Sequence, residues 1–277
     1  MSLRTSLACA AAVALASTLA ACGGSSGTSV AADCTPAHEF STIEEGTLTV
    51  ALYDLPPFAK LDGKAITGVD GDLIKAIAEK ECLTITAKPA ATAAVIPMVQ
   101  SGRADVAVAD WYRTAERAEI VALSDPLYTD QMALISEDGI SDIAALKGKK
   151  VGTVDGYLWV ADMKKFLGGD LKVYSTTLNM NQDLKAGRIE VGIDSFGSGK
   201  FNNKDLQVKV AESNPEVAAS QEGAQASFPL PLDNKELLAA INADIAELHS
   251  NGELAKILVA NGLDASAADT GAPRLIK

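Results

Sequence analysis

Histidine is nearly absent from this 277-residue chain, which contains only His38 and His249. His38 follows a Gly/Ser-rich segment and His249 lies on an expected C-terminal helix, so neither is expected beside a ligand cleft. This scarcity argues against a Ser-His or Cys-His catalytic site. Residues that could bind a metal do not cluster along the sequence, and scattered acids on an acidic protein are usually solvated. We therefore expect no catalytic residue, no metal and no cofactor.

Basic residues are in the minority, with 24 Lys and Arg against 36 Asp and Glu, a formal net charge of −12. No basic stripe is available to neutralise phosphates, which excludes nucleic acid as a partner. The segment DSFGSGKF (194–201) is similar to a phosphate-binding loop. It lacks the first glycine of that motif and the Ser or Thr after Lys200, so we interpret it as a turn.

Long apolar runs are absent except at the N-terminus, so no later segment is expected to span a membrane. Arg4 precedes an apolar run from Leu7 to Ala21, which has the length of a signal-peptide core. The run ends in Leu-Ala-Ala-Cys, which resembles a bacterial lipobox and implies a signal peptide over 1–21 and lipidation of Cys22. The alternative is a plain secretory signal with an incidental cysteine. Residues 22–45 are expected to be a tether and lead-in, anchored by lipid outside the cytoplasm.

Cysteine is rare, with four in the chain. Cys9 leaves with the signal peptide and Cys22 carries lipid, so Cys34 and Cys82 remain in an oxidising compartment, where a pair is expected to close. Cys82 ends an expected helix that runs antiparallel to the first strand and finishes near its start, where Cys34 leads in. The alternative is two free buried thiols.

Strand and helix patterns alternate through most of the chain. The expected strands of a first unit are 47–53, 83–88 and 104–109, and its helices are 72–81 and 94–101. The pattern restarts with strands 150–154, 171–174 and 189–194 and with helices 156–166 and 180–186. This β-α-β-α-β order predicts two α/β units with parallel sheets.

The C-terminal part adds helices without strands. An amphipathic helix is expected from about 234 to 249, capped by Asp233, with a last helix over 253–260. Residues 264–277 are expected to be a frayed tail.

An unusual cluster follows the strand at 104–109. Asp110-Trp111-Tyr112-Arg113 and then Arg117 gather there, although only 5% of the residues are aromatic. In open α/β sheets, ligands bind outside the carboxyl ends of strands. The cluster therefore indicates a binding site; the alternative is a solvated loop with surface ion pairs.

Seven stretches in order resemble the polar amino-acid (family 3) substrate-binding proteins of ABC importers. They are DLPPFA (54–59), GVDGDLIKAIAEK (68–80), IPMVQSGRADVAVAD (96–110), TAERAEIVALSDPLY (114–128), LKGKKVGTVDGY (146–157), LKAGRIEVGID (184–194) and INADIAELHSNGELAKI (241–257). The resemblance covers about residues 45–262. It implies a periplasmic-binding-protein-like type II fold, in which two α/β lobes joined by two crossover strands hold ligand between them. Lobe 1 would comprise 46–130 plus 224–277, and lobe 2 would comprise 131–223.

The resemblance also implies a ligand site. Arg117 corresponds to the arginine that binds the ligand carboxylate, a role that suits its rigid bidentate fork; the alternative is a surface pair with Glu116 or Asp125. Asp110 and Tyr112 stand where the family has small hydroxyl or backbone donors.

Other positions depart from the family pattern as well. Leu55 stands where an aromatic packs on the ligand, and Tyr157 stands where a hydroxyl residue is common. The acidic anchor for the ligand ammonium is expected at Ser195, with Asp194 one place early. Aromatic faces near carboxylates suit a cation, especially an alkylated one. Trp159 and Phe196 are either part of this site or core, and Arg113 is expected to be solvated. The predicted ligand-binding residues are Leu55, Asp110, Trp111, Tyr112, Arg117, Tyr157, Asp194 and Ser195.

The implied function is that of an extracytoplasmic solute-binding lipoprotein. It would capture a small polar, carboxylate-bearing amino acid or cationic derivative and deliver it to an ABC permease, acting as a monomer. Two alternatives remain: a sensor or adaptor for a membrane receptor, and a periplasmic dehydratase of the same fold with Asp110 and Asp194 as general acid and base.

Overall fold

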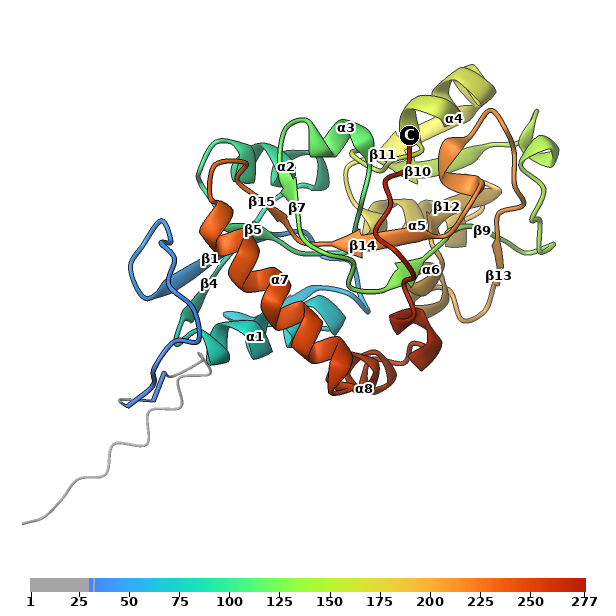
Figure 1. Ribbon diagram of the computed structural model, residues 1–277. Coiled ribbons are helices and arrows are strands. Elements are labelled where there is room, and N and C mark those ends of the chain that lie inside the picture. Colours follow the sequence, from blue (N-terminus) through green and yellow to red (C-terminus); the bar gives the residue numbers. More distant parts are fainter. Residues whose placement is uncertain (1–29, 32) are drawn as a thin grey trace, which may run out of the picture.

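The computed structural model describes residues 30–31 and 33–277. The predicted signal peptide, the lipobox with Cys22 and most of the tether lie outside the described residues. The described chain forms two α/β lobes that lie side by side (Figure 1). No helix in this part combines the length and apolar character needed to cross a bilayer.

The first lobe is built on a parallel three-stranded sheet. Its order is β4-β1-β5, from β4 (Thr84–Pro89), β1 (Thr47–Leu52) and β5 (Val106–Ala107). Helices α1 (Val69–Lys80) and α2 (Thr92–Gln100) form the crossovers that parallel strands require. The expected apolar stripe of α1 is buried, at Leu73, Ile74, Ile77 and Ala78. The predicted β-α-β-α-β unit is therefore confirmed, with a short hairpin of β2 (Lys60–Asp62) and β3 (Ala65–Thr67) inserted before α1.

The second lobe is built on a mixed five-stranded sheet. Its order is β11-β10-β12-β9-β13, from β11 (Leu171–Tyr174), β10 (Val151–Val154), β12 (Val191–Ser195), β9 (Met132–Ser136) and β13 (Gln207–Val210). Strand β10 runs parallel to both neighbours, as predicted, whereas β9 pairs antiparallel with β12 and β13. The helices are α4 (Val160–Leu167), α5 (Thr177–Lys185) and α6 (Phe196–Asn202). Helix α4 begins after the predicted start at Gly156, because Gly156 has a φ of 84° that a right-handed helix excludes.

Two extended segments cross between the lobes. Strand β8 (Thr129–Asp130) pairs antiparallel with β14 (Ala224–Ser227), and β14 also pairs with β6 (Trp111–Tyr112). Strand β15 (Pro229–Leu230) then returns the chain to the first lobe beside β7 (Ala122–Leu123). The aromatic pair of β6 is thereby placed at the junction of the lobes.

The C-terminal helices cover the first lobe. Helices α7 (Lys235–Ser250) and α8 (Glu253–Ala260) pack against α1, as Figure 1 shows. The cap of α7 is Asn234, whose side chain accepts a hydrogen bond from Leu237 N at 3.1 Å, so the assignment of Asp233 as the cap is wrong. The helix begins one residue later than the sequence pattern suggested, and the cap moves with it.

The C-terminal tail is docked rather than frayed, which corrects the expectation for residues 264–277. Figure 1 shows it leaving α8 and passing β14. Gln225 Nε2 on β14 donates to the carbonyls of Thr270 and Ala272, at 2.7 and 2.8 Å. Ile276 is buried, and its backbone bonds to both Arg113 and Ala115. These partners come from distant parts of the chain, so the tail sequence alone carried no sign of them.

The lead-in is anchored to the end of α1. Cys34 and Cys82 form the predicted disulfide, with 5.8 Å between their Cα atoms. Four residues further along, His38 contacts the Glu81 carboxylate through its backbone N at 3.0 Å and its Nδ1 at 2.6 Å. The lead-in is therefore held by one covalent bond and by an adjoining polar contact.

One cluster of metal-ligating side chains contradicts the expectation that none would form. Donor atoms of His38, Glu81 and Asp244 lie within 4.8 Å of one another. They meet because the lead-in and α7 both pack on the end of α1, which sequence spacing does not reveal. The Lys80 amine lies 2.8 Å from Asp244 Oδ1, so a protein cation already balances the buried carboxylates.

Candidate functional site

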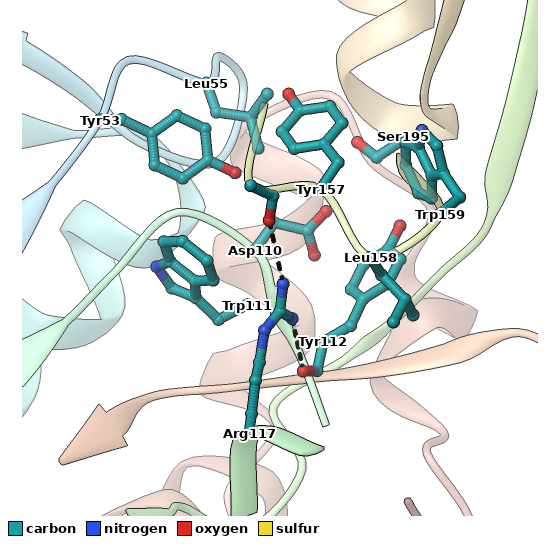
Figure 2. Close-up of a pocket in the computed structure, with 11 residues that line it drawn as sticks. Tyr53, Leu55, Asp110, Trp111, Tyr112, Arg117, Tyr157, Leu158, Trp159 and Ser195 are labelled. Atoms are coloured by element: carbon teal, nitrogen blue, oxygen red, sulfur yellow. Dashed lines mark hydrogen bonds between the residues drawn. The ribbon is translucent and has the colours of Figure 1, made fainter. Parts of the chain in front are cut away.

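A cavity lies between the lobes and is partly open to solvent (Figure 2); the space in it amounts to about 300 Å³ when the adjoining solvent is included. It is lined by Tyr53, Leu55, Asp110, Trp111, Tyr112, Arg117, Gly156, Tyr157, Leu158, Trp159 and Ser195. Seven of the eight predicted ligand-binding residues are in this lining. The eighth, Asp194, is not: it is fully buried, where its carboxylate accepts hydrogen bonds from Ser195 N and Ser198 Oγ.

A strained turn directs Asp110 into the cavity. Ala109 and Asp110 have φ angles of 104° and 55°, which non-glycine residues adopt rarely and at a cost. Both of their N–H groups donate to Asp70 Oδ2, each at 2.8 Å, and the Tyr128 hydroxyl donates to Asp70 Oδ1 at 2.7 Å. Burial raises the pKa of Asp70, and these hydrogen bonds oppose the rise. Asp70, on the first turn of α1, therefore holds the turn in place.

Arg117 projects into the cavity from α3 (Ala115–Ala118), whose N-cap Thr114 accepts from Arg117 N at 3.0 Å. Its Nη1 donates to Tyr112 O at 2.7 Å, and its Nη2 reaches Gly156 O of the other lobe at 3.4 Å, as Figure 2 shows. Its Cζ lies 4.9 Å from the centre of the Trp111 ring. Burial lowers its pKa. In the part of the chain that is described, Arg117 has no ion pair with Glu116 or Asp125, so the guanidinium keeps donors for an added anion.

Aromatic rings line the two sides of the cavity. Ring centres lie 5.4 Å apart for Tyr53 and Trp111, 6.4 Å for Tyr53 and Tyr157, and 5.1 Å for Tyr157 and Trp159. Trp159 is almost fully buried and also lines the cavity, so it serves as both core and wall. Phe196 packs on the core outside the lining, with the Lys200 amine 5.5 Å from its ring centre.

Three buried carboxyls surround the base of the site. Burial, followed by the charges of Asp130 and Asp70, raises the pKa of Asp110 well above its usual range. Burial raises the pKa of Asp130 to about 6 and that of Asp194 to about 7. Asp110 Oδ1 and Asp130 Oδ2 receive no N–H or hydroxyl hydrogen bond from the described residues. Burial and the neighbouring acids therefore favour the protonated form of Asp110.

These carboxyls predict an unusual pH dependence of stability without ligand. A pKa raised from 3.8 to about 7 means that folded Asp194 stays protonated where the unfolded chain has released its proton. The stabilisation is present below pH 4 and is lost as the pH rises through 7. A shift of one in pKa corresponds to about 1.4 kcal/mol, so ionising Asp194 in the folded protein lowers the free energy of unfolding by roughly 4 kcal/mol. The urea midpoint should therefore fall from pH 5 to pH 8, and fall less in Asp194→Asn; parallel curves for the two proteins would contradict the assignment.

Arg113 is not solvated, which corrects the expectation from the sequence. It is half-buried and donates to the backbone carbonyls of Leu123, Ser124 and Arg274. The docked C-terminal tail supplies one of these acceptors and covers the side chain. Arg113 therefore holds the tail and does not line the cavity.

Three lining residues were not predicted: Tyr53, Gly156 and Leu158; for a fourth, Trp159, the sequence leaves the site and the core open as alternatives. Tyr53 ends the first expected strand, so the rule that ligands bind at the carboxyl ends of strands was a usable signal. Asp70 also belongs to a quoted motif, but its acceptor role depends on a turn 39 residues later. No local sequence pattern predicts such a contact.

Comparisons with known proteins agree with this architecture. A profile described as "Bacterial extracellular solute-binding proteins, family 3" matches residues 48–260. The arginine-binding extracellular protein ArtP of Bacillus subtilis (strain 168) is 29% identical over 212 residues, 74% of this chain and 81% of ArtP. An ancestral arginine-binding protein bound to arginine has a TM-score of 0.70 at 30% identity, covering 78% of this chain and 98% of its own.

Similarity to a third known protein is evidence for the fold alone. An ancestral amino acid-binding protein, described as a precursor of cyclohexadienyl dehydratase, has a TM-score of 0.69 at 23% identity, covering 78% of this chain and 95% of its own. The type II periplasmic-binding-protein fold expected from the sequence is confirmed. The chain belongs to the bacterial extracellular solute-binding proteins of family 3.

Proposed function

We propose that this protein captures a small carboxylate-bearing amino acid or cationic amino-acid derivative outside the cytoplasm and delivers it to an ABC permease. The observation that carries the proposal is the Arg117 guanidinium, which faces a cavity between the lobes without an acidic partner from Glu116 or Asp125. A guanidinium offers a planar fork to a carboxylate, so the ligand would complete this ion pair.

The opposite end of the ligand would meet the acids and rings. Asp110, Ser195 and the aromatic walls provide acceptors and π faces for an ammonium group. Arg117 and Asp110 precede β8, whereas Tyr157 and Ser195 follow it, so one bound molecule would contact both proposed lobes, 46–130 plus 224–277 and 131–223. Ligand would then favour the closed arrangement, because only that arrangement makes both sets of contacts. A permease would recognise the closed form.

Anchoring at the membrane is part of the proposal. Lipid on Cys22 and the Gly/Ser-rich tether would hold the lobes near a permease while leaving them free to turn. The name of the relative ArtP, an arginine-binding protein, supports an amino acid as the class of cargo.

A ligand screen tests this function. The mature chain, with Cys22→Ser in place of lipidation, would be examined by thermal shift against amino acids, betaines, amines and guanidines. Compounds that carry both a carboxylate and a cation should raise the melting temperature, since ligands that bind only the folded state stabilise it. Stabilisation by amines and guanidines alone, with no response to any carboxylate, would count against the proposal.

Two alternatives use the same site. A sensor or adaptor would bind the same ligand but leave its uptake unchanged when the gene is deleted, whereas a transport component would not. The raised pKa values of Asp110 and Asp130 support the dehydratase alternative, because such carboxyls suit general acid and base roles. Turnover of a prephenate-like substrate by the purified protein would select this alternative.

A further inference from the structure

We propose that the C-terminal tail, residues 264–277, is a positioning element of the ligand site. It caps the helix that carries Arg117 and ties that helix to the crossing strand β14. The inference rests on the proposed function, because it concerns the residue that would hold the ligand carboxylate. The placement of that residue can nevertheless be tested without any ligand.

Helix α3 is too short to be stable through its own hydrogen bonds. It has four residues, Ala115–Ala118, and the first N–H groups of any helix lack partners inside it. Thr114 Oγ1 accepts from Arg117 N at 3.0 Å. The N–H of Ala115 donates instead to the carbonyl of Ile276, at 2.8 Å. The tail therefore completes the N-terminal cap of the helix from which Arg117 projects.

Ile276 is held firmly beside this helix. Its N–H donates to Arg113 O at 3.0 Å, and a parallel bridge joins it to Thr114. Its side chain is only 6% exposed and packs in the hydrophobic core, whereas the neighbouring Leu275 is exposed. Burial of the Ile276 side chain therefore keeps the capping carbonyl in place.

The preceding part of the tail is attached to β14 through Gln225, which is buried. The Gln225 side chain donates to the carbonyls of Thr270 and Ala272, at 2.7 and 2.8 Å, and accepts from Arg274 N at 2.8 Å. The Gln225 carbonyl also accepts from Arg113 N at 2.9 Å. One residue of the crossing strand thus contacts both the tail and the segment that leads into α3.

The tail also contacts the chain on either side of the junction between the lobes. The Arg274 guanidinium donates to Gly223 O, just before β14, and its Nε lies 3.3 Å from Glu222 Oε2. On the other crossing strand, β8, Thr129 Oγ1 donates to Ala267 O at 3.3 Å. A movement of these strands as the lobes close would therefore be transmitted through the tail to α3.

The direction of the Arg117 side chain depends on the backbone around it. Its guanidinium donates to two backbone carbonyls, those of Tyr112 at 2.7 Å and Gly156 at 3.4 Å, as Figure 2 shows. A bidentate fork binds a carboxylate well only when the two groups are aligned. Displacement of α3 would therefore reduce ligand affinity although the tail does not line the cavity.

The experiment compares Ile276→Asn with Leu275→Asn by hydrogen exchange followed by NMR. Both variants place the same polar side chain in the tail, at a buried and at an exposed position. In Ile276→Asn the Ala115 amide should exchange at least about tenfold faster, because its acceptor is released, while the amides of β1 exchange as before. Leu275→Asn should leave both rates unchanged. Ile276→Ala, a milder change, should give the same pattern with a smaller amplitude.

Two results of this comparison would overturn the inference. One is an Ala115 exchange rate that is the same in Ile276→Asn and Leu275→Asn. The other is equally faster exchange at Ala115 and throughout β1, since that would show only a loss of global stability.

A titration then tests whether the tail acts through Arg117. The probe is L-arginine, because the relative ArtP is named as an arginine-binding protein. Ile276→Asn should weaken its binding about tenfold in the unmodified protein, but less than about twofold when Arg117→Ala is already present. An equal weakening in both backgrounds would contradict the positioning role.

The inference and the proposed function fail on different results. If no carboxylate-bearing compound binds, the proposed function fails, and the exchange of the Ala115 amide alone decides whether the tail holds α3. If L-arginine binds through Arg117 while Ala115 exchanges equally in the two tail variants, the proposed function stands and the inference is wrong.

Discussion

Replacing Arg117 with alanine should weaken the binding of carboxylate-bearing ligands by at least about 100-fold. Truncating one partner of a buried, hydrogen-bonded charge pair costs 2–5 kcal/mol, and each 1.4 kcal/mol corresponds to a factor of ten in affinity. The ligand carboxylate would also be left in a partly enclosed cavity without the cation that the proposed function assigns to it. Calorimetric titration of the first hit from the ligand screen measures the change.

Two variants show whether the loss belongs to the guanidinium. Arg117→Lys keeps the charge but not the fork, so an intermediate affinity is expected. Arg103→Ala removes an exposed arginine of the same lobe and should leave affinity unchanged. If a carboxylate ligand binds Arg117→Ala within about threefold of the unmodified protein, the proposed role of this residue is wrong.

Replacing Asp70 with alanine should cost roughly 3–5 kcal/mol of stability, a large change for one buried polar side chain. The change removes the acceptor for the N–H groups of Ala109 and Asp110 and for the Tyr128 hydroxyl. The positive φ angles of that turn would then lack the contacts that offset their strain. Urea denaturation gives the free energy of unfolding, and titration gives the accompanying loss of affinity as Asp110 moves.

Asp62→Ala is the comparison for this variant, because it makes the same change of charge at an exposed position of the β2–β3 hairpin. Its stability should lie within about 0.5 kcal/mol of the unmodified protein. A similar urea midpoint for Asp70→Ala and Asp62→Ala would show that the turn at Ala109 and Asp110 does not depend on Asp70.

Several features could be predicted because they depend on local sequence patterns. Alternating apolar strands and amphipathic helices predicted the α/β lobes, since the periods of burial in each element follow from its own backbone geometry. The cluster after residue 109 lies at the carboxyl end of a strand, and this position predicted that Asp110 and Arg117 would line a cavity. The pair of Cys34 and Cys82 followed from their positions at neighbouring ends of a strand and a helix.

Contacts between distant segments were decided only by the packed structure. The docking of Ile276 on residues 113–115, the meeting of His38 with Asp244, and the support of the Asp110 turn by Asp70 each join segments that share no local pattern. Such contacts depend on how whole helices and strands are positioned by core packing. The free energy of that packing is the sum of many small apolar contacts along the chain. The periodicity of apolar residues in the sequence determines which face of a helix or strand is buried. The partner of a buried polar group is determined only by the three-dimensional arrangement of these elements.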